Sequence, residues 1–84
     1  MFIRSQNRDV LLNVNDICFN KLNIHSEIIY QFRCYGYGDD YYILGEYSTE
    51  QKALKVLDEI QKRTEYQYPK AFQMPQDDEV EENG

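Results

Sequence analysis

Two adjacent carboxylates, Asp39 and Asp40, stand in the segment from residue 34 to residue 42 and could contribute to a site for divalent cations. Phosphoryl transfer by two metal ions needs several carboxylates that converge from separate strands and hold the ions about 4 Å apart. Asp16 and Glu46 are further candidate ligands, but a polymerase-type site would also need a larger chain and a basic channel. Glycine and aspartate are frequent between strands for backbone reasons alone. We therefore interpret the segment as a turn and predict no metal site.

Two other catalytic patterns are incomplete. Gly36 and Gly38 supply the first two glycines of a G-x-G-x-x-G phosphate loop, but Tyr41 occupies the third position, and a strand rather than a helix is expected to follow. The single histidine, His25, lies nine residues before Cys34, and no sequence feature brings the two together as a nucleophile and base. We therefore predict that the protein is not an enzyme and has no cofactor.

A nucleic-acid site is the alternative hypothesis. Arg33, Tyr35 and Tyr37 alternate along one predicted strand and partly match the RNP1 strand of RNA-recognition motifs. Such a face could stack one or two bases on its tyrosine rings. That motif places a helix between its first two strands, however, and residues 10–30 show no helical pattern. The aspartates at the turn would also repel phosphate, so we do not expect nucleic acid to be the partner.

Tyrosine is the most distinctive component of the chain, with eight copies in 84 residues. Tyrosine combines a rigid apolar ring with a polar tip, and exposed tyrosines are typical of protein-binding patches. The same rings could instead cover the second face of a small sheet, and both descriptions can hold in a homo-oligomer. The candidate partner-binding residues lie in and beside one predicted hairpin: Tyr35, Tyr37, Tyr41, Tyr42 and Tyr47.

The charge of the chain is concentrated at its C-terminus. The formal net charge is −6, and five of the acidic residues lie between residues 77 and 82, which leaves about −1 for the rest. We expect one domain over residues 1–75 and an acidic, disordered tail over residues 76–84. The body has no basic excess for a phosphate backbone. The two cysteines lack the spacing of metal ligands, and the sequence shows neither an apolar targeting segment nor a membrane-spanning stretch. We therefore predict a cytoplasmic protein that does not contact a membrane.

The N-terminal half of the chain has the pattern of short strands. Residues 2–5 and 10–14 should form a hairpin, followed by a short strand at 17–20 and a turn at 21–23. The clearest strand covers residues 26–36 and is expected to bury Ile28, Tyr30, Phe32 and Cys34 on one face. Residues 41–47 should pair with it in an antiparallel hairpin, with Gly45 at a bulge or a close contact.

One amphipathic helix is predicted from Ser48 to about Tyr66, because Ser48 and Gln51 have capping-box spacing and apolar residues then recur at helical intervals. Beyond the helix, residues 70–74 have the pattern of an edge strand with Phe72 and Met74 on one side. The expected fold class is α+β, with a curled antiparallel sheet of four to five strands and the C-terminal helix packed on it. A pleckstrin-like, partly open barrel is one variant of this arrangement.

Three stretches of the chain also resemble known sequences: MFIRSQNRDVLLNV, ILGEYSTEQKALKVLDEIQ and FQMPQDDEV. They are similar to a group of small, largely uncharacterised proteins of Gram-positive bacteria and of their phages and prophages. The group has no assigned reaction, so the resemblance implies a bacterial setting and a phage accessory role but no site residues. Together with the tyrosines, it favours a non-enzymatic interaction protein that binds a host or phage protein.

Overall fold

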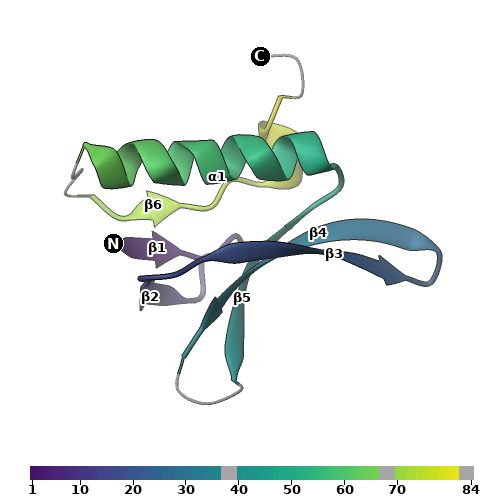
Figure 1. Cartoon of the computed structure of the whole chain (residues 1–84), viewed down its shortest axis with the longest axis horizontal. Helices are drawn as coiled ribbons and strands as arrows, with labels where there is room; N and C mark the ends of the chain where they lie inside the picture. Colours follow the sequence, from purple (N-terminus) through teal and green to yellow (C-terminus); the bar gives the residue numbers. More distant parts are fainter. Residues whose placement is uncertain (37–39, 67–69, 82–84) are drawn as a thin grey trace.

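The computed structural model describes residues 1–36, 40–66 and 70–81. Six strands, one α-helix and one 3₁₀ helix follow each other in this part of the chain (Figure 1). The strands are β1 (Phe2–Arg4), β2 (Leu11–Asn13), β3 (Cys18–Ile24), β4 (Glu27–Tyr35), β5 (Tyr41–Tyr47) and β6 (Phe72–Gln73), and the helices are α1 (Glu50–Glu65) and η1 (Asp77–Glu79).

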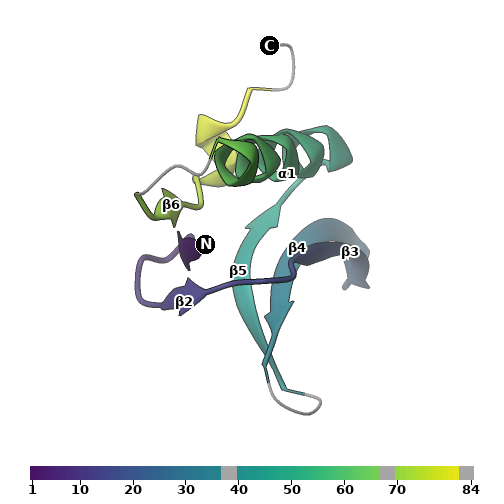
Figure 2. The same cartoon turned by 60° about the vertical axis from the view of Figure 1, so that its left-hand side comes forward.

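The strands form two three-stranded sheets, so the α+β class is confirmed but the single curled sheet is wrong. One sheet has the order β2-β1-β6 and the other β3-β4-β5. The strands do not form one continuous sheet because residues 14–17, between β2 and β3, are not in a strand. In addition, β6 pairs with β1 in parallel and does not extend either hairpin. The sheets do not close into a barrel, and Figure 2 shows β4 and β5 curving away from α1.

Two of the expected hairpins are present. β1 pairs with β2 in antiparallel register, and β4 pairs with β5 in the same way. The turn predicted at residues 21–23 is wrong, since β3 continues to Ile24 and pairs with β4 as far as Glu27. The chain reverses instead at His25 and Ser26, whose φ angles of 51° and 68° are both left-handed. Two such residues between paired strands match the twist of a tight hairpin.

A single core joins both sheets to α1. Its largest fully buried side chains are Tyr47, Phe32, Ile3, Leu44 and Met74. The predicted core face of β4 is confirmed for Phe32 and Cys34, which are buried. Ile28 on the same face is 44% exposed, because this end of β4 lies beyond the part of the sheet that α1 covers.

The helix begins two residues later than predicted and is capped by a different residue. Thr49 is the N-cap, and its side chain accepts a hydrogen bond from the backbone N–H of Lys52 at 3.2 Å. Its inward face buries Ala53, Val56 and Ile60. The capping role assigned to Ser48 is wrong, because the hydroxyl of Ser48 donates to a carboxylate of the C-terminal segment.

Residues 76–81, at the start of the predicted acidic tail, make specific contacts with the rest of the chain. Asp77 lies in η1, and its carboxylate accepts hydrogen bonds from the backbone N–H of Ser48 at 2.8 Å and from the Ser48 hydroxyl at 2.9 Å. The ammonium group of Lys52 lies 3.5 Å from the same carboxylate. These contacts hold the segment against the first turn of α1. The last three residues of the expected tail, 82–84, lie outside the described part of the chain.

Gln6, in the turn after β1, joins the two sheets. Its backbone N–H donates to the carbonyl of Leu44 at 2.7 Å, and its side-chain amide both accepts from the N–H and donates to the carbonyl of Glu46. The same amide nitrogen donates to the carbonyl of Pro75, and the side chain of Gln76 donates to the carbonyl of Gln6. Gln6 therefore acts as an extra strand residue beside β5 and holds the C-terminal segment.

Replacement of Gln6 by alanine should lower the free energy of unfolding by about 1 to 2 kcal/mol, because three side-chain hydrogen bonds are lost at partly solvated sites. Urea unfolding at neutral pH measures the difference. Asn7→Ala is the matched control, since Asn7 is exposed in the same turn and should change stability by less than about 0.5 kcal/mol. Equal effects of the two variants would contradict the role assigned to Gln6.

Asp77 should make the protein sensitive to acid. Burial by itself would raise the pKa of the Asp77 carboxyl, but the Ser48 donors and the Lys52 ammonium outweigh it and hold the pKa below the ordinary value of 3.8. Stability from this group is therefore complete above pH 3.8 and is lost as the pH falls through the lower folded pKa. Asp77→Asn should flatten this part of the curve of stability against pH.

Urea midpoints measured across that acid range test the assignment. Asp78→Asn is the control, because Asp78 is the neighbouring exposed carboxylate of the same short helix. An acid dependence that is identical in wild type and Asp77→Asn would show that the contact with Ser48 and Lys52 does not contribute to folding.

Candidate functional site

A β-bulge in β5 decides which side chains the β4–β5 hairpin displays. Phe32 is paired with Gly45, but the next residue, Arg33, is paired with Ile43, so Leu44 is an extra residue without a partner on β4. Paired residues share a face of a sheet, and one inserted residue moves every later side chain to the opposite face. Without the bulge, Ile43 would share the buried face of Phe32. With it, Ile43 lies on the outer face beside Arg33.

The position of the bulge follows from the close approach of Gln6. The backbone N–H of Gln6 reaches the carbonyl of Leu44, and a Cβ atom added at Gly45 would lie 3.3 Å from the Cβ atom of Gln6. Glycine at this position therefore permits close contact between backbone and side chain. The sequence-based prediction of a bulge or close contact at Gly45 is confirmed, and both occur.

The outer face of the hairpin carries a connected row of polar and aromatic side chains. The guanidinium carbon of Arg33 lies 4.2 Å from the ring centre of Tyr41, within the range of a cation–π contact, and the ring of Tyr41 lies 5.9 Å from that of Tyr35. The Nε atom of Arg33 donates to Gln31 at 2.6 Å, and the Gln31 amide donates to the carboxylate of Glu46 at 2.9 Å. The ring of Tyr41 thus contacts both a cation and a second ring.

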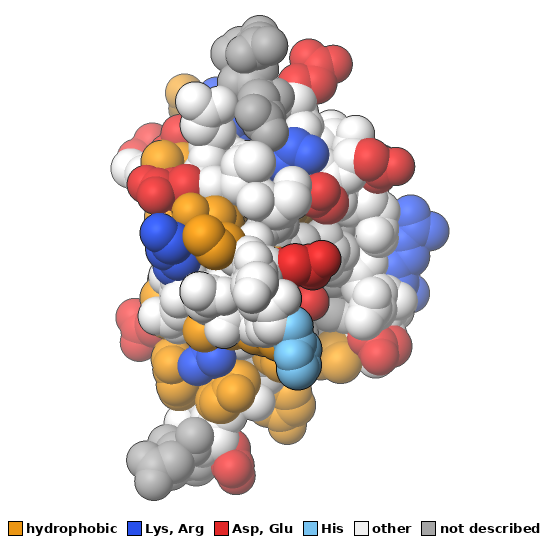
Figure 3. Space-filling view, turned by 90° about the vertical axis from the view of Figure 1, so that its right-hand side faces the viewer, with side chains coloured by type: hydrophobic (Ala, Val, Ile, Leu, Met, Phe, Trp, Pro, Cys, Tyr) orange, Lys and Arg blue, Asp and Glu red, His pale blue; other side chains and the backbone are white. Residues whose placement is uncertain are grey.

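Exposed large apolar side chains are concentrated on the sheet that carries this row. Of the ten that are exposed in the described residues, six belong to β3, β4 and β5: Ile24, Ile28, Tyr35, Tyr41, Tyr42 and Ile43. Figure 3 shows hydrophobic side chains gathered over the lower part of the molecule, where this sheet lies. We call the outer-face group of Arg33, Tyr35, Tyr41 and Ile43 the hairpin surface. It lies near the tip of the hairpin, which points away from α1 (Figure 1).

The structure separates the five tyrosines that the sequence groups together. Tyr35 and Tyr41 meet on the outer face, whereas Tyr42 is paired with Cys34 and projects from the opposite face, where it is 51% exposed. Tyr37 lies outside the described residues. The assignment of Tyr47 to a binding surface is wrong, because Tyr47 is 1% exposed.

Tyr47 is a core residue with a satisfied hydroxyl. Its ring meets Phe32 edge to face at 5.6 Å, and its hydroxyl donates to the carbonyl of Pro75 at 2.8 Å. Burial, with the nearby charges of Asp77 and Glu79, raises the pKa of the Tyr47 hydroxyl above its ordinary value. Tyr41 and Tyr47 are six residues apart, so an unbroken strand would place both on the same face. The bulge between them places them on opposite faces.

Ile43 is a further surface residue, and it is not among the candidate residues that the sequence indicates. Ile43 belongs to β5, which is an edge strand of its sheet. Gly45 was the available signal, because a glycine in an apolar strand marks a place where alternation can change.

Within the described residues, the side chains considered for catalysis are not arranged as a catalytic site. His25 and Cys34 lie near opposite ends of β4, and burial raises the pKa of the Cys34 thiol, which opposes its activation as a nucleophile. The backbone N–H of Gly36 donates to the carbonyl of Asp40, so these residues close the turn. No group of three or more potential metal ligands occurs within residues 1–36, 40–66 and 70–81.

No family model matches this chain. Comparisons with curated proteins and with solved structures also give no match. The resemblance to small proteins of Gram-positive bacteria and their phages stays a prediction. Among the described residues, no helix is both long enough and apolar enough to span a membrane.

Single substitutions of Tyr41 and Tyr47 test which of the two tyrosines belongs to the core. Tyr47→Leu should lower the free energy of unfolding by about 2 to 4 kcal/mol, because a buried ring contact and a buried hydrogen bond are lost. Tyr41→Leu should cost less than about 1 kcal/mol, since it removes only a surface contact with Arg33 and Tyr35. Guanidinium unfolding of both variants gives the comparison. Equal losses would contradict the face assignment made by the bulge.

Proposed function

We propose that this protein acts by binding another protein and that the hairpin surface is its contact surface. The observation that carries the proposal is the group of exposed apolar side chains on β4 and β5, beyond the part of the sheet that packs into the core. Exposure of several large apolar side chains in one region is unfavourable in water and is typical of an interaction site. A partner that covers them would recover this free energy.

The arrangement of the outer face suits recognition because its side chains are already ordered. The ring of Tyr41 contacts both the guanidinium of Arg33 and the ring of Tyr35. A side chain that is ordered before binding loses less conformational entropy when the complex forms. Tyrosine and arginine are also the residue types that most often dominate the energy of protein interfaces. The proposed centre of the interface is therefore Arg33, Tyr35 and Tyr41, with Ile43 beside it.

The charges near this face favour a protein over a nucleic acid as partner. Arg33 is the cation of the row, its Nε already donates to Gln31, and the carboxylate of Glu46 closes the row at its other end. Asp40 is exposed at the turn, and the chain carries a net charge of −6. A phosphate backbone would be repelled by both carboxylates.

Single-stranded nucleic acid is the second candidate, because a guanidinium over one tyrosine beside a second tyrosine is also an arrangement on which bases can stack. This candidate predicts binding of an oligothymidine that weakens steeply with salt. Binding of that probe, lost on substitution of Tyr35 and Tyr41, would replace the protein-binding proposal.

From the resemblance to phage and prophage proteins we further propose that the partner is a protein of the bacterial cytoplasm. On this proposal the protein is an accessory factor of a phage that modulates a host or phage protein and performs no reaction itself. A second copy of the chain is the other possible occupant of the surface, and the experiment below separates the two cases.

A pair of matched double variants tests the proposal. The surface variant carries Tyr35→Ser and Tyr41→Ser, and the control carries Leu54→Ser and Tyr66→Ser, two exposed apolar residues at α1. A partner captured from a bacterial host lysate by the wild type is purified and titrated by calorimetry against all three proteins. The surface variant should bind at least about tenfold more weakly, and the control within about twofold of the wild type.

Three outcomes would contradict the proposal. These are the absence of any partner that binds in the purified titration, equal losses in both variants, and unchanged affinity of the surface variant. Sedimentation of the free protein adds a further distinction. A dimer that only the surface variant disrupts would identify the occupant as a second copy and not as a separate partner.

A further inference from the structure

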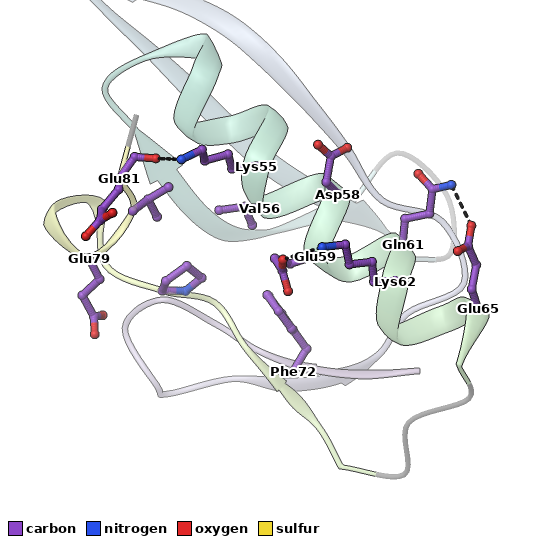
Figure 4. Close-up of a pocket in the computed structure, with 12 residues that line it drawn as sticks. Lys55, Val56, Asp58, Glu59, Gln61, Lys62, Glu65, Phe72, Glu79 and Glu81 are labelled. Atoms are coloured by element: carbon purple, nitrogen blue, oxygen red, sulfur yellow. Dashed lines mark hydrogen bonds and ion pairs between the residues drawn. The ribbon is translucent and has the colours of Figure 1, made fainter. Parts of the chain in front are cut away.

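A second surface feature lies on the helical side of the molecule, away from the hairpin surface. A groove of about 770 Å³ runs between α1 and the segment from residue 72 to residue 81 (Figure 4). Its apolar lining comes from four residues of both walls: Val56, Phe72, Pro75 and Val80. A volume of this order is typical of sites that hold a small ligand or a few residues of a peptide.

The rim of this groove is predominantly acidic. Five carboxylates line it, three from α1 and two from the C-terminal segment: Asp58, Glu59, Glu65, Glu79 and Glu81. Two lysines face them, of which Lys62 lies 3.4 Å from Glu59 and Lys55 donates to the backbone carbonyl of Glu81. A further cation, Arg63, packs its guanidinium 5.2 Å from the ring centre of Phe72. The five carboxylates therefore outnumber the three cations, and the acidic excess comes from Glu79 and Glu81 on the C-terminal wall, because α1 contributes three of each sign.

The C-terminal wall is fixed in place by its own contacts. Asp77 is bound by Ser48 and Lys52, and the carboxylate of Glu79 accepts the backbone N–H of Gln76 at 2.8 Å. The groove is thus formed before any ligand binds, which reduces the entropy that binding would cost.

We propose that this groove binds an extended peptide segment of a partner protein, in which an apolar side chain is flanked by lysine or arginine. The apolar side chain would lie against Val56, Phe72 and Val80, where it leaves water. The basic side chains would then reach the carboxylates of Asp58 and Glu81 on opposite walls, and this complementarity sets specificity and the rate of association. An anionic ligand would be repelled by the same rim.

Two short peptides serve as probes. The first is a fluorescein-labelled hexapeptide of sequence Lys-Arg-Leu-Leu-Arg-Lys, and the second has the same leucines flanked by aspartate and glutamate. Fluorescence anisotropy should show binding of the basic peptide at low salt, a weaker complex at high salt, and no binding of the acidic peptide. Failure of the basic peptide to bind at low salt would overturn the proposal.

Two charge-reversal variants separate the groove from the general acidity of the chain. Asp58→Lys with Glu81→Lys changes the rim, and Asp16→Lys with Glu27→Lys makes the same change in net charge at exposed positions elsewhere. The rim variant should lose at least about tenfold in affinity for the basic peptide, and the control should stay within about threefold. Equal losses would show that only net charge attracts the peptide and would overturn the proposal.

Amide chemical shifts locate the peptide independently of any variant. Addition of the basic peptide to the wild type should shift resonances of α1 and of residues 72–81. Shifts confined to the hairpin surface would overturn the groove assignment. This outcome is independent of the function proposed for the hairpin surface, which is tested with a different partner and different residues.

Discussion

The fold depends on the contact that Gln6 makes with β5. One residue of the turn after β1 pairs with the bulged strand through its backbone N–H and through both ends of its side-chain amide. The same amide reaches Pro75, so the N-terminal sheet, the central hairpin and the C-terminal segment meet at one side chain. A domain of this size has a small core and a thin margin of stability, so hydrogen bonds between its two sheets matter more than they would in a larger protein. The hydrogen bonds of Gln6 are directional, so they fix how the N-terminal sheet is aligned with β5.

The bulge beside Gln6 links this architecture to the candidate site. It allows Leu44 to enter the core and at the same time transfers Ile43 and Tyr41 to the outer face. There, Tyr41 meets Arg33 and Tyr35, whereas Tyr47, beyond the bulge, remains in the core. One inserted residue therefore satisfies the core and creates an ordered exposed surface, because side chains alternate between the faces of a strand.

The acidic C-terminal residues take part in the structure instead of only adding charge. Asp77 exploits donors at the start of α1, where an anion is favoured by the free N–H groups and by Lys52. This contact places Glu79 and Glu81 opposite the carboxylates of α1 and forms the acidic rim of the groove. The hairpin surface and the groove lie on different parts of the molecule (Figure 1) and differ in chemistry, since one is aromatic and the other is apolar with an acidic border.

The sequence by itself determined the elements whose signals are local. The amphipathic period of residues 50–65, the alternation in β4, the hairpin into β5 and the importance of Gly45 could all be predicted from it, as could an edge strand at residues 70–74, of which only Phe72 and Gln73 form β6. Only the tertiary structure decided the division into two sheets, the burial of Tyr47, the exposure of Ile43 and the docking of Asp77 on Ser48. Each of these results depends on residues distant in sequence, such as Gln6 and Pro75 beside β5. Local propensity carries no information about such pairings, because their free energy exists only when the distant segments have already met.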